Sequence, residues 1–218
     1  MLNRLNKTRL AAYYQVSVLS LAASVIYSAP YLRQLFKTSM LDAFSLTEVQ
    51  LGTLSSMYGI SCVLTYLPGG WLADKVAPRT LVIIALFSSA ATYAWYATIP
   101  SYFELLIIHA LWGVIGVGIL WAALFKHIRL LVGGEEQGRM FGSFEGIRGL
   151  FEAALFTVAA FVFTLFATRQ QGMINVILVY TVFATALGIL MLFSRTGHNS
   201  PGAETNEQIR LTDFIIKN

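Results

Sequence analysis

The stretch PGGWLADKVAPRT, residues 68–80, separates two apolar runs that are each long enough for a membrane-spanning helix. It groups the charged residues Asp74, Lys75 and Arg79 on a turn that is too short to hold a folded domain. A short charged break between two apolar runs is typical of a connection at the membrane surface. The stretch therefore predicts a pair of transmembrane helices, one on each side of it.

The composition of the whole chain extends this prediction. Of its 218 residues, 56% are hydrophobic and only 12% are charged, and the mean hydropathy is +0.66. A water-soluble globule of this composition would have too little polar surface to cover itself. We therefore expect an integral membrane protein.

A transmembrane helix needs about 20 mostly apolar residues, and six segments meet that requirement. We predict an all-α fold, an integral membrane six-helix bundle within residues 1–194, followed by a cytoplasmic tail or linker over residues 195–218. Ser45 or Thr47 is expected to cap the second helix at its start. The predicted spans cover about residues 11–32, 50–69, 80–98, 104–125, 140–166 and 173–193.

Lysine and arginine are concentrated on one side of the predicted spans. Eleven of them lie on the side of the N-terminus, whereas three, Arg33, Lys37 and Arg169, lie on the opposite side. Because cytoplasmic loops carry an excess of Lys and Arg, both termini are predicted to be cytoplasmic. The formal net charge of +4 then reflects membrane topology, and no nucleic-acid partner is expected.

A stripe of hydroxyl groups runs along the first span. On a helix with about 100° per residue, these side chains occupy roughly one third of the circumference. The stripe could line an aqueous cavity for a polar solute or pack against a neighbouring helix. Its tyrosines favour the cavity, and Tyr27 and Tyr31 are predicted to contact the solute. The stripe comprises Tyr13, Ser17, Ser20, Ser24, Tyr27, Ser28 and Tyr31.

The fifth span carries three ionisable residues, Glu145, Arg148 and Glu152, at spacings that place them on one face. The spacing predicts pairing of Glu145 with Arg148 and of Arg148 with Glu152. Charges inside a membrane are costly and mark functional sites, so Glu152, near the middle of the span, is predicted to contact the solute or to carry a proton. The alternative is a neutralised ladder of ion pairs that only fixes helix packing.

The other faces of the fifth span are also distinct. Phe144, Phe151 and Leu155 lie on the side opposite the glycines and are expected to face lipid. A stripe of small residues is expected to let another helix approach closely. This stripe comprises Gly138, Gly142, Gly146, Gly149 and Ala153.

The fourth span contains His109, on the same face as Trp112, Gly113 and Gly116. Such a histidine is either a ligand or proton relay of the solute cavity, or a hydrogen-bonded packing residue. The chain has no metal-ligand cluster, phosphate-binding glycine loop or nucleophilic triad in its sequence. We therefore expect no enzyme activity, no metal and no cofactor.

The opening stretch resembles the signature of the major facilitator superfamily, G-x-x-x-D-[R/K]-x-G-[R/K]-[R/K] in the loop after the second helix. The chain differs from it at Ala77, where the family has glycine, and at Pro78, where it has a basic residue. Further stretches between His109 and Gly149 resemble a bacterial branch that includes sugar, sugar-derivative and organic-anion transporters. The matching residues are Gly70, Asp74, Lys75 and Arg79.

The resemblance covers the N-terminal half of a family member. It implies six helices arranged as a 3+3 inverted repeat, in the bacterial inner membrane, and a second six-helix half that is covalently linked or separate. It also implies that Gly70, Asp74, Lys75 and Arg79 form a conformational gate that bridges to that second half. In many family members an arginine stands at the position of His109.

The implied function is that of a secondary active transporter for a small polar solute such as a sugar or an organic anion, coupled to protons or to exchange. The predicted solute contacts are Tyr27, Tyr31, His109 and Glu152. Two alternatives remain open: a membrane sensor or interaction subunit that does not transport, and a homodimer of half-transporters.

Overall fold

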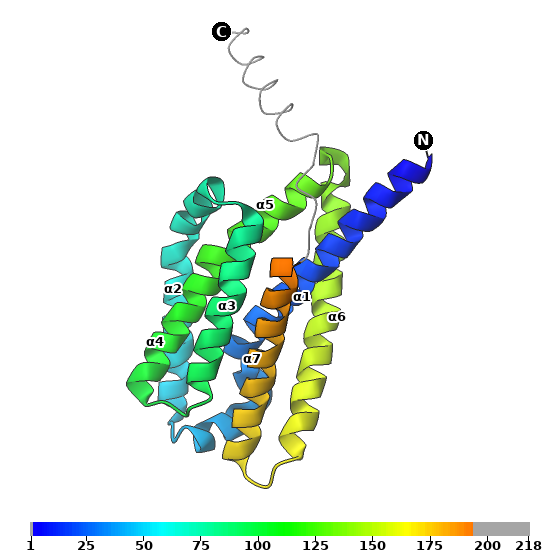
Figure 1. Cartoon of the computed structure of the whole chain (residues 1–218). Coiled ribbons are helices and arrows are strands. Elements are labelled where there is room, and N and C mark those ends of the chain that lie inside the picture. Colours follow the sequence, from blue (N-terminus) through cyan, green and yellow to red (C-terminus); the bar gives the residue numbers. More distant parts are fainter. Residues whose placement is uncertain (1, 194–218) are drawn as a thin grey trace.

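The computed structural model describes the backbone of residues 2–193 and the side chains of residues 9–193. The described part is a bundle of six long helical segments (Figure 1). The predicted tail, residues 195–218, lies outside it. The elements are α1 (Leu2–Ala43), α2 (Glu48–Lys75), α3 (Pro78–Tyr96), α4 (Tyr102–Gly113) continuing through the π-helix η1 (Val114–Trp121) into α5 (Ala122–Leu131), a 3₁₀ turn η2 (Gly134–Glu136), α6 (Gln137–Thr164) and α7 (Arg169–Phe193).

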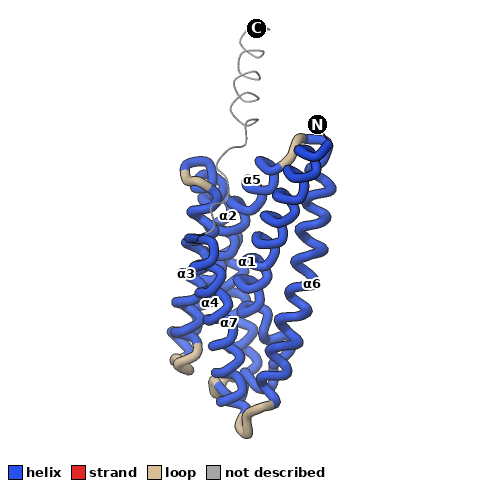
Figure 2. Tube along the Cα trace, turned by 45° about the vertical axis from the view of Figure 1, so that its right-hand side comes forward, coloured by secondary structure: helices blue, strands red, loops and turns tan. Residues whose placement is uncertain are grey.

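Four of these helical segments are long and apolar enough to cross a membrane: Arg9–Ala43, Tyr102–Leu131, Gly134–Thr164 and Arg169–Phe193. The predicted membrane spans are thus supported for four of the six segments. Helices α2 and α3, with 28 and 19 residues, run alongside the others (Figure 2). Serine, threonine and tyrosine lower the hydropathy of both.

The signature stretch is mostly helical, and the prediction of a loop after residue 69 was wrong. Helix α2 continues through Pro68 to Lys75, so Gly70 and Asp74 lie in its last two turns. A proline is tolerated here because neighbouring groups in a membrane bundle can satisfy the backbone groups that it frees. The helix ends at Lys75, and Val76 and Ala77 follow it in non-helical conformations. Ala77 precedes Pro78 and has φ −57° and ψ 130°, because the residue before a proline avoids helical geometry.

Helix α1 is the central helix of the bundle. It extends well beyond the predicted residues 11–32, with a local break at Phe36, where φ is −118° and ψ is 29°. Residues 22–29 are all buried, so neighbours surround this part of α1 on every side. The next helix starts as predicted, because Thr47 caps α2 in a capping box with Gln50.

Tyrosine hydroxyl groups tie the middle of α1 to its neighbours. Pro30 has no N–H, which leaves the carbonyl of Ile26 without its usual helical donor. Tyr93 of α3 donates its hydroxyl proton to this carbonyl at 2.6 Å. From the other side, the Tyr27 hydroxyl donates to the carbonyl of Gly116 in η1 at 2.8 Å. These bonds satisfy polar groups at a depth where water is absent.

Helix α2 packs against the α4–η1 segment through glycines. A Cβ atom added at Gly69 would lie 2.5 Å from the carbonyl oxygen of Gly118, and one added at Gly113 would lie 2.7 Å from the carbonyl oxygen of Tyr58. Backbones can approach this closely only where side chains are absent. The neighbouring Gly70, by contrast, has no atom within 4 Å of an added Cβ.

The start of α1 and the end of α7 lie at the same end of the bundle (Figure 1). At the opposite end, Lys37 pairs with Glu48 at 2.9 Å and Arg169 pairs with Asp42. These pairs join α1 to the start of α2 and to the start of α7. The bundle is therefore closed by ion pairs at the end with fewer basic residues.

Adjacent glycines of α2 provide a test of this packing. Gly69→Ala is expected to lower the unfolding temperature, because overpacking against the Gly118 backbone costs about 1–3 kcal/mol. Gly70→Ala meets no neighbour and is expected to leave stability unchanged or to raise it by up to about 1 kcal/mol through helix propensity. Thermal unfolding of both variants in detergent checks this, and equal stability would contradict the close approach of α2 and η1.

Candidate functional site

The three ionisable residues of α6 form a continuous ladder of ion pairs. The Nε and Nη2 atoms of Arg148 donate to Oε2 of Glu145 at 2.9 and 2.8 Å, and Nη1 donates to Oε2 of Glu152 at 3.0 Å. The structure thus contains both pairs that the spacing predicts. The side chains keep 46%, 25% and 22% of their surface exposed for Glu145, Arg148 and Glu152, respectively. The ladder therefore lies on an open face of the bundle.

The faces of α6 are the reverse of those predicted. Phe144 and Leu155, expected to face lipid, are buried within the bundle. Gly142, Gly146 and Gly149, expected to pack closely, have no atom within 4 Å of an added Cβ. The small residues that allow close approach lie on α1 instead, and α6 turns Phe144 and Leu155 inward and its glycines outward.

The serines of α1 provide that close approach. Ser20 donates its hydroxyl proton to the carbonyl of Phe144 at 3.0 Å, and Ser24 donates to the carbonyl of Arg148 at 3.0 Å. Both serines are fully buried. Of the two alternatives for the hydroxyl stripe, the structure shows helix packing for these serines. They also fix the backbone that carries Arg148.

Two tyrosines of the stripe, Tyr27 and Tyr31, behave differently, because they contact other aromatic rings. The ring of Tyr27 meets Trp121 edge-on at 5.6 Å between centroids, and Trp121 meets Phe125 at 4.8 Å. Phe125 in turn meets Phe141 of α6 at 5.3 Å. Tyr31 is half-buried and contacts Tyr58 of α2 at 6.3 Å. The aromatic chain therefore connects α1, the fourth helical segment and α6.

His109 lies apart from this chain, in an aromatic core between α3 and α4. Its Nδ1 atom is 2.8 Å from the carbonyl oxygen of Leu105, and its ring lies 4.6 Å from that of Trp112 and 6.1 Å from that of Tyr96. Only 4% of the residue is exposed. The contacts of His109 come from α3 and α4, whereas Tyr27 and Glu152 lie on α1 and α6. A role of His109 in solute contact stays a prediction.

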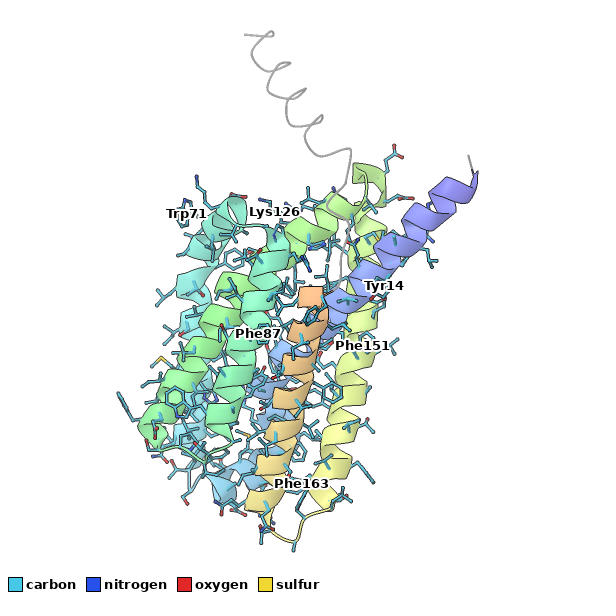
Figure 3. The ribbon with its side chains drawn as sticks, in the orientation of Figure 1. Tyr14, Trp71, Phe87, Lys126, Phe151 and Phe163 are labelled. Carbon is cyan, nitrogen blue, oxygen red and sulfur yellow. The ribbon has the colours of Figure 1, made fainter. Side chains whose placement is uncertain are left out.

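The charged end of α2 has a partner that the sequence reasoning missed. Lys126 of α5 donates to the carbonyl of Ala73 at 2.8 Å and lies 3.7 Å from Oδ1 of Asp74. A cation at the C-terminus of a helix stabilises its dipole. Lys126 and Trp71 lie at this same end of the molecule (Figure 3). The signal in the sequence was a basic residue at the same membrane side, at the end of the fourth span.

Arg79 also binds a helix terminus. Its Nη2 atom donates to the carbonyls of Met191 and Leu192 at 2.6 and 3.3 Å. These carbonyls belong to the last described turn of α7. The side chain of Lys75 is exposed. Arg79 therefore joins the start of α3 to the end of α7.

A metal centre is not supported within residues 9–193, where no three His, Cys, Asp or Glu side chains group in a way that could hold an ion. The site that the described residues offer consists of the aromatic chain and the charged ladder. Hydrogen bonding, ring stacking and proton exchange are the chemistry available to it.

Comparisons with known proteins point to one family. A family model described as Major Facilitator Superfamily matches residues 10–216. The inner membrane protein YqcE of Escherichia coli (strain K12) is 27% identical over 204 residues, which cover 92% of this chain and 48% of that protein. The inner membrane protein YihN of the same organism is 30% identical over 177 residues, or 81% and 42% of the two chains. The chain spans about half the length of these curated relatives.

The contact of Arg79 with α7 can be tested locally. Arg79→Gln is expected to raise amide hydrogen exchange in the last turn of α7 about tenfold, because a charge-assisted hydrogen bond contributes about 1.5–3 kcal/mol. Lys75→Gln removes a charge from the same connection without touching α7 and is the matched control. Mass spectrometry of exchange in detergent checks both variants. Unchanged exchange in Arg79→Gln would show that α7 ends independently of this residue.

Proposed function

Because this chain belongs to the major facilitator superfamily, we propose that it forms the N-terminal six-helix half of a secondary transporter that moves a small polar solute across a bacterial inner membrane. The observation that carries the proposal is the ladder of Glu145, Arg148 and Glu152 on the open face of α6. Ionisable side chains at membrane depth mark solute or ion pathways. Family membership indicates the transport function, and the ladder indicates where in this chain the solute or ion path runs.

In this proposal all six helical segments cross the membrane, as two inverted triplets with both termini in the cytoplasm. The parallel course of α2 and α3 with the four more apolar segments supports this arrangement (Figure 2). The accumulation of basic residues on the side of the N-terminus supports the orientation.

A second six-helix half is the proposed partner, and it covers the open face of α6. Lipid is a poor neighbour for this face, because ion pairs in hydrocarbon lose their hydration. The glycines beside the ladder leave room for a close helix. The relatives also have about as much chain again beyond the part that this chain matches.

The end of α2 is the proposed gate toward that second half. Gly70 and Asp74 lie one helical turn apart, and both are exposed. Asp74 can therefore accept hydrogen bonds from the N-terminus of a partner helix while Lys126 holds it at 3.7 Å. Arg79 anchors the connection from the other side, through α7. In this gate, Lys126 and Arg79 hold the two ends of the connection, and the face with Gly70 and Asp74 stays accessible to the second half.

Glu152 is the proposed site of proton or solute exchange within the ladder. It accepts one of the three hydrogen bonds that Arg148 donates to the ladder, whereas Glu145 accepts two. It also lies near the middle of α6. Its carboxylate can therefore exchange partners at a lower cost than that of Glu145.

Uptake measurements in proteoliposomes test the function. We expect uptake of labelled polar solutes when the chain is reconstituted with a co-expressed second half. Glu152→Gln is expected to reduce this uptake at least tenfold, because the neutral amide can neither pair with Arg148 as an ion nor carry a proton. Glu135→Gln, an equivalent change on the exposed turn before α6, is the matched control and should keep full uptake.

Two results would contradict the proposal. Solute binding without any flux would favour a sensor or interaction subunit. Uptake by the chain alone, together with a crosslinked dimer in membranes, would favour a homodimer of half-transporters. Uptake that survives in Glu152→Gln would remove this residue from the solute path.

A further inference from the structure

The aromatic chain and the charged ladder meet on α6. The chain of rings starts at Tyr27 on α1. It runs through Trp121 and Phe125 and returns to α6 at Phe141, one turn before Glu145. We call the accessible part of this arrangement the aromatic–carboxylate patch; it comprises Trp121, Phe125, Phe141, Glu145, Arg148 and Glu152.

The charges of the patch alternate in sign. Arg148 stands between two carboxylates and directs three N–H groups to them. Only the Oε2 atom of each carboxylate receives these bonds, so the Oε1 atoms of Glu145 and Glu152 accept no hydrogen bond from residues 9–193. The patch thus presents two free acceptor oxygens, one on each side of the paired guanidinium of Arg148.

This alternation of charge favours some classes of solute over others. An organic anion would meet two carboxylates and an arginine that is already engaged, with a net charge of −1 for the three residues. No other basic residue lies in the middle of α6, because Arg139 is in its first turn. A cation would approach the carboxylates only beside the guanidinium of Arg148. A hydroxyl group both donates and accepts, so a row of hydroxyl groups fits each position.

The aromatic side of the patch complements such a solute. Trp121, Phe125 and Phe141 are each half-buried and keep part of their rings accessible. The electron-rich faces of aromatic rings attract the weakly positive C–H groups of a sugar or polyol. Solute sites commonly combine apolar and aromatic walls with a few polar groups that fix orientation.

We propose that the aromatic–carboxylate patch binds a neutral polyhydroxylated solute, a sugar or a polyol, and discriminates against organic anions. The proposal rests on the transport function proposed above and narrows its solute class. Hydroxyl groups donate to the free oxygens of Glu145 and Glu152, and the carbon skeleton packs on the rings of Trp121 and Phe125. The second half completes the site from the opposite side.

Cys62 provides a built-in reporter for this surface. It is the only cysteine of the chain, it is partly exposed on α2, and it lies one turn from Tyr58. Tyr58 contacts Tyr31 of α1, which lies one turn from Tyr27, and the ring of Tyr27 meets Trp121 of the patch. A solute on the patch is therefore expected to slow alkylation of Cys62 by a small thiosulfonate reagent.

The test uses the whole 218-residue chain in lipid nanodiscs. Glucose, galactose and mannitol serve as neutral probes, gluconate and glucuronate as anionic probes, and glucosamine as a cationic probe. We expect at least one neutral probe to slow the alkylation of Cys62 threefold or more, and the anions at the same concentration to have no effect. Tryptophan fluorescence should shift with the same neutral probe, and the shift should disappear in Trp121→Phe.

Variants inside and outside the patch distinguish a loss of solute binding from a general loss of stability. Glu145→Gln and Phe125→Ala are expected to weaken protection by the neutral probe at least tenfold. Glu135→Gln and Phe166→Ala, which alter exposed residues outside the patch, should leave it unchanged. Protection by an anion or by glucosamine alone, or by none of the probes, would overturn the proposal. Transport itself is judged separately, because uptake of an anion in proteoliposomes would leave the proposed function intact.

Discussion

Inside a bilayer, backbone groups have no water to bond with, and the architecture of this protein depends on how α1 meets that constraint. Pro30 frees the carbonyl of Ile26, and Tyr93 of α3 satisfies it. In the same stretch of α1, the Tyr27 hydroxyl donates a hydrogen bond to the carbonyl of Gly116 in η1. The Ser24 hydroxyl donates one to the carbonyl of Arg148 in α6. One buried helix thereby positions three neighbours. Each bond contributes only about 1 kcal/mol, but together they set which face of each helix turns inward.

The position of the charged ladder follows from this arrangement. Ser20 and Ser24 of α1 bind the backbone of α6, and Phe144 and Leu155 are buried, whereas the glycines and the ion pairs of α6 point outward. An open face with charges is unsuited to lipid and suited to a water-filled path beneath a second domain. Lys126, which holds the end of α2 beside Asp74, and Arg79, which binds the end of α7, lie at one end of the same bundle. In this proposal, the packing, the gate and the solute surface all depend on the same core.

Composition and charge predicted the helical membrane bundle, and capping signals predicted the start of α2 at Thr47. The spacing of Glu145, Arg148 and Glu152 predicted their mutual contacts, since neighbours on a single helix are determined by its periodicity. Contacts between helices were not predictable in this way. The glycines of α6 and the serines of α1 carry the same signal for close packing, and only the three-dimensional arrangement shows which of them is used. Lys126 and the contact of Arg79 with α7 were missed because both join segments that are distant in the sequence.

We propose that the ladder face of α6 borders water, whereas the outer faces of the bundle border lipid. Gly149, beside Arg148, and Val182, exposed on α7, both lie near the middle of their helices and allow a matched comparison. In a Cys62→Ser background, G149C and V182C are labelled in native membranes with a hydrophilic maleimide. The account predicts labelling at least ten times faster for G149C than for V182C. Equally slow labelling of the two variants would contradict it, because the ladder would then face lipid or a closed protein core.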